Sequence, residues 1–256
     1  MTDLSYKEKQ DKLQIRIRAH KEFANFDIDE WIDAFLGRRS RRDVLDLGCG
    51  NGNHLRLYLK HVGPSGTVAG IDREASLVAD ARSAYSGAPN LDLRIGSMDE
   101  PLPFVDETFD TCLSNFAIYN ATDPERTLLE LRRVLRPGGE LVLIGPTRDN
   151  AREIYEYNER LTGQAIDPVT LIRTDRLRQE ILPIVRRVFG GADEEIIDSF
   201  LTFPSQEEFL KYYTSTMLYE EGAEKQGKTM EQMRAALDRD RNIILSKQML
   251  AVIARS

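Results

Sequence analysis

A short glycine-rich segment that directly follows an apolar run constrains this chain more than any other feature. Residues 43–53 read DVLDLGCGNGN, so an apolar strand pattern runs into Gly48, Gly50 and Gly52, and a helical pattern follows. Glycines at such a junction permit a tight turn and let a ligand approach the backbone closely. The N-terminus of the following helix offers unpaired N–H groups and partial positive charge. The segment therefore predicts a strand–loop–helix unit that binds a ligand.

The spacing of this loop distinguishes between kinds of ligand. The dinucleotide fingerprint G-x-G-x-x-G would need glycine at position 53, where the chain has Asn53, and no G-x-x-x-x-G-K-[ST] phosphate loop is present. Asp46 precedes the glycines, and a carboxylate there would repel a pyrophosphate but suits a ligand that carries an ammonium group and a small carboxylate. Asp72 ends the next apolar run, where an acid can accept both ribose hydroxyl hydrogens.

Strand and helix patterns alternate over the middle of the chain. Five short apolar runs are typical of buried parallel strands: Val44–Leu47, Thr67–Ile71, Leu91–Ile95, Phe109–Leu113 and Glu140–Ile144. Amphipathic segments separate them, and one begins at an N-cap, Asp123, followed by Pro124 and stops at 136–139. Two more strands are expected at 195–203 and 248–254. The pattern predicts an α/β fold, a doubly wound, mostly parallel seven-stranded sheet with helices on both faces.

The flanking segments favour one domain over 1–256, because we find no internal repeat and no long linker. We expect four parts: an N-terminal helical cap (1–36), a cofactor-binding core (40–146), a helical insertion (149–173) and a C-terminal part with strands of the sheet and a substrate-side helix (174–256). Two capping-box spacings, Ser5 with Glu8 and Ser205 with Glu208, predict helix starts in the flanks.

Composition excludes several classes of protein. The chain has 256 residues, of which 41% are hydrophobic and 30% charged, as expected of a globular protein. Cys49 and Cys112 are too few for a disulfide scaffold or a four-thiolate zinc site, so we expect no metal and a reducing, cytoplasmic setting. No apolar run is long enough to cross a membrane. A net charge of −7 argues against general binding of nucleic acid.

Taken together, the motifs resemble the class I, Rossmann-like S-adenosylmethionine-dependent methyltransferases of the small-molecule type. The resemblance covers about 40–146 and lies in VLDLGCGNG, GIDRE, GSMDEPLPF, FDTCLSNFAIYN and LRRVLRPGGELVL. It implies S-adenosylmethionine as cofactor, S-adenosylhomocysteine as product and a small-molecule methyl acceptor. The cofactor-binding residues that it implies are Asp46, Gly48, Cys49, Gly50, Gly52, Asn53, Asp72, Arg73, Ser97, Met98, Asp99 and Asn115.

The chain departs from the family pattern at two places. The family often has aspartate directly after the glycine that ends the third strand, where it accepts the adenine amino hydrogens; here that position is Ser97, and Asp99 follows two residues later. Either residue could make the contact, with Met98 against the purine face. Many relatives also have a pair of histidines after the fourth strand, where this chain has Tyr119 and Asn120. The usual general base is therefore missing there.

Methyl transfer is an in-line displacement, and orientation of the two reactants can supply about 7–11 kcal/mol of its acceleration. A neutral amine needs no base, whereas a phenol or alcohol gains about 10²–10⁴-fold from one. We expect transfer to O or N in a partly apolar, capped pocket formed by 1–36, 149–173 and 205–222. The catalytic candidates are His20, Tyr119 and Asn120, and the substrate-binding candidates are Tyr6, Phe116 and Tyr212.

Other functions stay open from the sequence. An RNA or protein methyltransferase is the main alternative, since GRRSRR (37–42) is basic, although a solvated loop fits it better and we expect no nucleic-acid partner. A non-catalytic regulatory or scaffold protein that binds S-adenosylmethionine would share the glycine loop. Asn53 and Asp46 disfavour a nicotinamide-dependent oxidoreductase. The aromatic residues of the flanks would also suit a homodimer interface.

Overall fold

The strands of the computed structural model form a single seven-stranded sheet within the described residues, which are 10–165, 174–237 and 243–256. In chain order they are β1 (Asp43–Leu47), β2 (Thr67–Asp72), β3 (Leu91–Ile95), β4 (Phe109–Asn115), β5 (Leu135–Pro146), β6 (Asp193–Phe203) and β7 (Ile243–Arg255). Their order across the sheet is β3-β2-β1-β4-β5-β7-β6. Strands β1 to β5 pair in parallel, and β7 pairs antiparallel with both β5 and β6. The mostly parallel seven-stranded sheet is thus confirmed.

The helices cover both faces of this sheet. The helical segments are α1 (Gln10–Phe23), α2 (Ile28–Gly37), α3 (Leu55–Val62), α4 (Ala75–Ala84), η1 (Ile118–Asn120), α5 (Pro124–Val134), α6 (Arg152–Thr162), η2 (Leu177–Ile181), α8 (Leu182–Phe189), α9 (Gln206–Thr214), α10 (Met217–Tyr219), η3 (Glu220–Glu224) and α11 (Met230–Ala235). Residues of α2, α3 and α4 form one core with one face of the sheet, and residues of α5 and α8 form another with the opposite face. Two-sided coverage explains why the central strands are apolar throughout.

The starts of two helices follow the predicted caps. The Asp123 carboxylate accepts from the Arg126 N–H at 3.1 Å, with Pro124 at the first helical position of α5. The Ser205 hydroxyl accepts from the Glu208 N–H at 3.2 Å at the start of α9. These side chains satisfy N–H groups that a helix start leaves unpaired. The box predicted at Ser5 and Glu8 lies outside the described residues.

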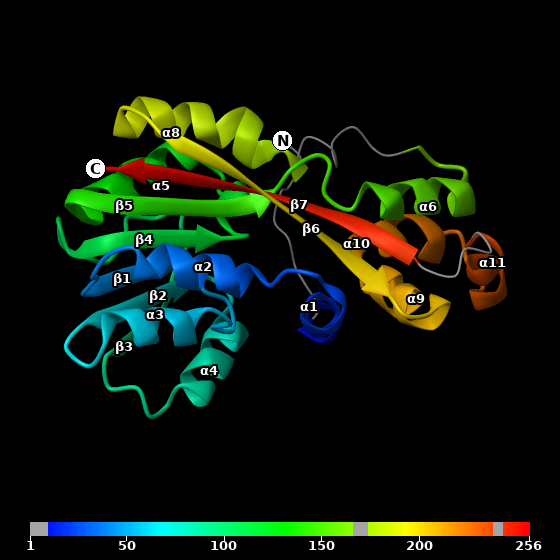
Figure 1. Ribbon diagram of the computed structural model, residues 1–256, viewed down its shortest axis with the longest axis horizontal. Helices are drawn as coiled ribbons and strands as arrows, with labels where there is room; N and C mark the ends of the chain where they lie inside the picture. The colour runs from blue at the N-terminus through cyan, green and yellow to red at the C-terminus, as the bar shows by residue number, and fades with distance from the viewer. Residues whose placement is uncertain (1–9, 166–173, 238–242) are drawn as a thin grey trace.

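The two C-terminal strands are longer than predicted, and their far halves build a second lobe. Figure 1 shows β6 and β7 running from the first lobe, around β1 to β5, into a group of helices that includes α6, α9, α10 and α11. The second lobe has its own core of Leu201, Phe203, Phe209, Tyr213 and neighbouring apolar side chains. Because β6 and β7 belong to both lobes, the sheet itself joins them.

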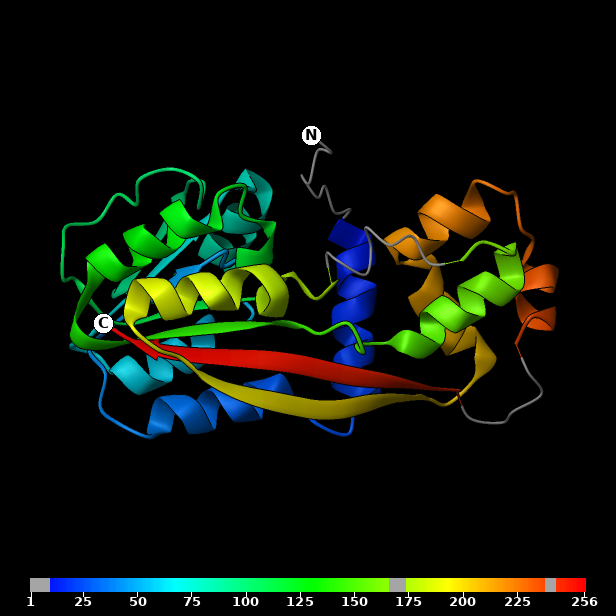
Figure 2. The ribbon, with the colours of Figure 1, turned by 90° about the horizontal axis from the view of Figure 1, so that it is seen from above.

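Helix α1 lies between the two lobes, as Figures 1 and 2 both show. After α1, Ala24 bridges Leu201 of β6, and the Asn25 side chain accepts from the Phe200 N–H at 2.7 Å. The chain then enters α2 and the first lobe. In the described residues, no helix is long and apolar enough to cross a membrane.

Candidate functional site

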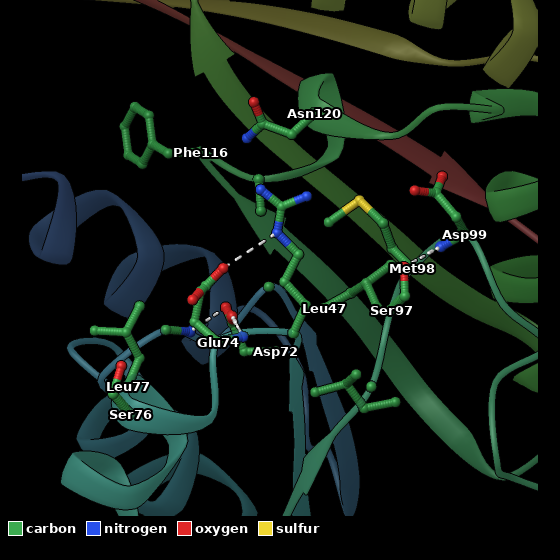
Figure 3. A pocket seen from close by; sticks show the side chains of 16 residues that line it. Leu47, Asp72, Glu74, Ser76, Leu77, Ser97, Met98, Asp99, Phe116 and Asn120 are labelled. Atoms are coloured by element: carbon green, nitrogen blue, oxygen red, sulfur yellow. Dashed lines mark hydrogen bonds and ion pairs between the residues drawn. The ribbon is translucent and has the colours of Figure 1, made fainter. Parts of the chain in front are cut away.

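A cavity of about 270 Å³ opens where β1, β2 and β4 end at their carboxyl edge. This edge, beside the first strand of an open parallel sheet, is where such folds bind ligands. Its lining residues are Leu47, Gly48, Gly50, Ile71, Asp72, Arg73, Glu74, Ser76, Leu77, Gly96, Ser97, Met98, Asp99, Phe116, Ala117 and Asn120. In Figure 3, Phe116 and Asn120 lie on one side of the cavity and Asp72 and Glu74 on the opposite side.

The glycine loop forms one wall of the cavity. Gly48 has φ +82°, and a Cβ there would overlap the Cβ of Ala117. Gly52 has φ +84°, and a Cβ there would lie 2.7 Å from Leu55 Cδ1. Both positions therefore need glycine for backbone conformation and for space. The loop is tied to β2, because the N–H of Gly48 donates to the Ile71 carbonyl at 2.8 Å.

Asp72 links the loop to the end of β2 at the cavity wall. Its Oδ2 accepts from the Gly50 N–H at 2.8 Å, and its Oδ1 accepts from the Glu74 N–H at 2.9 Å. Each carboxylate oxygen keeps a second lone pair that can accept from a ligand hydroxyl. The acid that the sequence predicts for a ribose is therefore fixed in position and lines the cavity.

Two acceptors lie buried behind the loop and fit a cationic group. Asp46 is only 2% exposed, and burial, followed by the charge of Asp72, raises the pKa of its carboxyl group to about 8. The Asn115 side chain donates to the Tyr58 hydroxyl at 2.7 Å, while its Oδ1 is buried without a hydrogen-bond partner among the described residues. Tyr58 also lies in the electrostatic field of Asp46, so these groups share one region. A ligand ammonium group would satisfy acceptors that are otherwise costly to bury.

The segment after β3 separates the two candidates for an adenine contact. The Asp99 carboxylate accepts from the Thr122 N–H at 2.7 Å and from the Thr122 hydroxyl at 3.0 Å, so it holds the loop before α5. The Ser97 hydroxyl accepts from the Asp99 N–H at 3.1 Å. Both residues line the cavity with Met98. Both oxygens of the Asp99 carboxylate accept from Thr122, whereas the Ser97 hydroxyl keeps its own hydrogen to donate.

The turn after β4 carries a strained residue at the cavity. Phe116 has φ +56°, a conformation that is rare for a large non-glycine side chain, and its N–H donates to the Ile144 carbonyl at 2.7 Å. Such backbone strain clusters at functional sites. Asn120 lines the same cavity. Tyr119 lies between them in sequence, with its ring against Gly145, and burial raises the pKa of its hydroxyl.

The remaining predicted catalytic and substrate residues lie on the side of the second lobe. The ring of His20 in α1 meets that of Tyr212 edge-on, with 6.1 Å between centroids. Burial, followed by the charges of Lys247 and Arg16, lowers the pKa of His20 well below its ordinary value, so the ring is neutral at pH 7. Neither residue lines the 270 Å³ cavity. Tyr6 lies outside the described residues.

Some residues that the resemblance implies as cofactor-binding do not line the cavity. Burial raises the pKa of the Cys49 thiol, which lies close to Gly70 of β2, so this cysteine is an unreactive packing residue. Gly52 is buried behind the loop, and Asn53 is exposed at its end. Asp46 and Asn115 also lie behind the lining, as described above.

Other residues of the site were not predicted. Glu74, Ser76 and Leu77 line the cavity at the start of α4. Glu74 lies only two residues after Asp72 in the sequence, and this proximity could have indicated that it belongs to the site. The apolar lining by Leu47 and Ile71 follows from their positions at strand ends. No group of three or more histidine, cysteine, aspartate or glutamate residues in the described parts of the chain is arranged to hold a metal ion.

Comparison with known proteins agrees with this geometry. Residues 39–202 match a family model described as a methyltransferase domain. The chain is 38% identical over 137 residues to an uncharacterized 37.1 kDa protein in transposon TN4556 of Streptomyces fradiae, a match that covers 52% of this chain and 39% of that protein. It is 31% identical over 174 residues to the ubiquinone/menaquinone biosynthesis C-methyltransferase UbiE of Geobacter sulfurreducens, covering 65% and 60%. The matches thus span less than two thirds of either relative.

The fold also has a solved counterpart. A SAM-dependent methyltransferase from Aquifex aeolicus superimposes with a TM-score of 0.57 and 17% sequence identity, and the match covers 96% of this chain and 99% of that one. At this identity the likeness concerns the fold. It extends over both lobes, because it covers nearly the whole of each chain.

Proposed function

This chain belongs to the class I S-adenosylmethionine-dependent methyltransferase family, and from that premise we propose that it methylates an O or N atom of a small-molecule acceptor by in-line displacement. The observation that carries the proposal is the position of Asp72, which lines the cavity and accepts from Gly50 of the glycine loop. The acceptor and the atom that receives the methyl group are the parts that we add to the family assignment.

Different residues around the cavity would bind different parts of the cofactor. Asp72 would accept from the ribose hydroxyls, and Ser97 and Met98 would meet the adenine, since the Asp99 carboxylate already holds Thr122. Asp46 and Asn115 would accept from the methionine ammonium group, because the Asp46 carboxyl group is buried and the Asn115 Oδ1 is buried without a hydrogen-bond partner among the described residues. When bound, S-adenosylmethionine supplies a methyl group that its positively charged sulfur activates for attack.

The residues on the acceptor side orient the nucleophile. Phe116 and Asn120 line the cavity and Tyr119 is buried beside them, so they stand where an acceptor would approach. Holding the acceptor in line can supply about 7–11 kcal/mol. For a phenol or alcohol, His20 stays the predicted base. Its ring is neutral at pH 7, but burial and the charges of Lys247 and Arg16 lower its pKa and make it a weaker base than a free imidazole. An amine acceptor would need no such base.

The basic segment before β1 supports a small-molecule acceptor over RNA. Arg41 is 3% exposed, donates to Glu140 at 2.8 Å and lies over the Phe35 ring. Arg39 also donates to Glu140, at 2.9 Å. These arginines therefore neutralise a carboxylate of the protein and are not a surface for phosphates.

A carbon acceptor is a second candidate, because the relative from Geobacter sulfurreducens is named a C-methyltransferase. Binding of the cofactor without turnover is the alternative of another class. We keep the division into cap (1–36), core (40–146), insertion (149–173) and C-terminal part (174–256) as a proposal for one methyltransferase domain. A homodimer and a cytoplasmic location stay predictions.

The test is a calorimetric titration with S-adenosylhomocysteine, with NADH as the comparison ligand. We expect micromolar affinity for S-adenosylhomocysteine and none for NADH. Transfer of a labelled methyl group from S-adenosylmethionine to a panel of phenols, amines and activated aromatic carbons then identifies the acceptor class. Binding of NADH alone, or of neither ligand, would overturn the assignment of the cavity. Binding without transfer to any acceptor would favour a regulatory role.

A further inference from the structure

A chain of polar side chains runs from α2, past the start of α3, to the end of β4. It begins at Asp29 of α2, continues through His54 directly before α3, and ends at the amide of Asn115. His54 Nε2 lies 3.4 Å from Asp29 Oδ1, and His54 Nδ1 lies 3.4 Å from the Asn115 amide nitrogen. Asn115 directly precedes Phe116, which lines the 270 Å³ cavity. The imidazole ring therefore connects the N-terminal helical cap to the candidate cofactor site.

The donors and acceptors of this chain determine where the ring hydrogen of His54 lies. A carboxylate only accepts, so the Nε2 atom, which faces Asp29, carries the hydrogen. Burial, partly opposed by the charge of Asp29, lowers the pKa of His54, so the ring is neutral at pH 7 and its Nδ1 atom is unprotonated. An unprotonated ring nitrogen only accepts. The part of the Asn115 amide that faces Nδ1 is therefore its NH₂ group.

Tyr58 alone would not fix the direction of the Asn115 amide. Its hydroxyl accepts from the amide nitrogen at 2.7 Å, but a hydroxyl could equally donate to the amide oxygen if the group were turned over. His54 removes this choice, because its Nδ1 atom has no hydrogen to offer. The Asn115 Oδ1 atom is thus left buried without a hydrogen-bond partner among the described residues. An amide turned over would present hydrogens to a ligand ammonium group and would repel it.

The other contacts of Asp29 hold its carboxylate in place. Its second oxygen, Oδ2, pairs with Arg56 of α3, and its side chain is 12% exposed. The Asp29 N–H donates to the carboxylate of Asp27, the N-cap of α2, at 3.0 Å. One oxygen therefore faces Arg56 and the other faces His54, so the packing of α2 against α3 decides the state of the imidazole ring.

We propose that His54 and Asp29 are positioning residues for the cofactor, which hold the Asn115 amide with its Oδ1 atom available to the ammonium group of S-adenosylmethionine. Neither residue would touch the ligand. Asp29 would fix the ring hydrogen on Nε2, and the unprotonated Nδ1 atom would hold the amide nitrogen. A helix of the N-terminal cap thereby takes part in cofactor binding. This inference rests on the proposed function, since it deepens the account of the same site.

The test compares S-adenosylhomocysteine with its deaminated analogue, which keeps the carboxylate and has hydrogen in place of the amino group. Calorimetry measures the affinity of the whole protein for each ligand. His54→Leu removes the acceptor, so we expect the affinity for S-adenosylhomocysteine to fall about tenfold and that for the analogue to stay within about twofold. His54→Asn should restore most of the lost affinity, because the oxygen of its amide can accept in the place of Nδ1.

Asp29→Asn tests the position of the ring hydrogen at almost unchanged size. Arg56 only donates, so it takes the oxygen of the new amide, and the NH₂ group then faces His54 and moves the ring hydrogen to Nδ1. We expect the affinity for S-adenosylhomocysteine to fall about fivefold, with that for the analogue unchanged. Nitrogen-15 NMR of the ring should show hydrogen on Nε2 in the unchanged protein and on Nδ1 in Asp29→Asn. The His54→Asn variant identifies the signal among those of the three histidines.

Asp33→Asn is the matched control, because Asp33 is on the same helix and pairs with Lys60 and His61 of α3 at 2.8 Å each. It should leave both affinities unchanged. If S-adenosylhomocysteine fails to bind the unchanged protein, the proposed function fails. If it binds, the positioning role alone is overturned by any of three results: equal losses of both ligands in His54→Leu, unchanged affinities in that variant, or the same loss in Asp33→Asn as in Asp29→Asn.

Discussion

At the scale of single residues, Asp72 joins the folding of the loop to the binding of a nucleoside. It accepts from the backbone N–H groups of Gly50 and Glu74 and lines the cavity. We expect Asp72→Ala to weaken binding of S-adenosylhomocysteine at least tenfold, because charge-assisted hydrogen bonds are lost. Calorimetry measures the effect.

Asp106→Ala is the matched control for this prediction. Asp106 is an exposed carboxylate paired with Arg133, and surface pairs of this kind contribute little. Its removal should leave the affinity unchanged. An Asp72→Ala variant with the affinity of the unchanged protein would remove the ribose assignment.

The raised pKa of Asp46 predicts that ligand binding releases a proton. Its folded-state pKa of about 8 lies above the usual value near 4, so the carboxyl group is protonated at pH 6–7 in the free protein. Arrival of an ammonium group favours the carboxylate and expels that proton. Binding of S-adenosylhomocysteine at pH 6.5 should therefore release a large fraction of one proton, seen as a dependence of the binding enthalpy on buffer ionisation enthalpy. Asp46→Asn should release none from this site.

The same pKa has a consequence for stability. The pKa of Asp46 is raised on folding, so its contribution to stability is complete below about pH 4 and is lost as the pH rises through 8. The stability of the free protein should therefore fall over this interval by up to about 1.4 kcal/mol per pH unit from this group. Urea unfolding at several pH values checks the slope. A slope that is identical in Asp46→Asn would contradict the assignment.

His20 is tested by separating turnover from binding. Its ring is neutral at pH 7 and contacts Tyr212, away from the cofactor cavity. For a phenol or alcohol acceptor, His20→Gln should lower turnover by about 10²-fold or more. Affinity for S-adenosylhomocysteine should stay within twofold. Unchanged turnover on such an acceptor would leave the site without a named base.

At the scale of elements, the far halves of strands β6 and β7 form part of the core of the second lobe. Phe203 of β6 is fully buried, and its ring lies 5.6 Å from Phe209 and 5.4 Å from Tyr212. Phe203→Ala should cost about 3–5 kcal/mol of unfolding free energy. Phe200, also on β6, is 43% exposed, so Phe200→Ala should cost less than about 0.5 kcal/mol. Equal losses in urea unfolding would contradict the described core.

The strands and helices of the first lobe were predictable, because there the local sequence pattern of each element agrees with its burial in the folded protein. The strands around Asp46 and Asp72 are apolar on both faces, and Asp123 caps its helix by a local hydrogen bond. The positions of β6 and β7 beyond the first lobe were not predictable, since their pairing depends on residues far apart in sequence. The left-handed conformation of Phe116 had no local signal either, because glycine is the usual residue there.

Part of the candidate site could likewise be predicted from the sequence. Gly48, Asp72 and Met98 line the cavity as expected, since motif residues at strand ends converge at one edge of the sheet. His20 and Tyr212 do not line this cavity, because they lie on elements that meet only in the folded chain.

At the scale of the whole molecule, charge sets the expected partners. The net charge is −7, and Arg39 and Arg41 of the basic segment are occupied by Glu140. At physiological salt, binding to single-stranded RNA should be weaker than about 10⁻⁴ M. Filter binding at several salt concentrations measures it. Micromolar affinity that falls steeply with salt would favour a nucleic-acid methyltransferase.

The order of strands also has a consequence for synthesis. Of the seven described strands, β7 is made last, yet it lies between β5 and β6. While a ribosome has not yet released Ile243–Arg255, β5 has a bare hydrogen-bonding edge and β6 lacks the strand with which it pairs along its length. Bare edges of this kind invite pairing with other nascent chains. The glycine loop can form early from local contacts, whereas the sheet that joins the two lobes is complete only after β7 inserts.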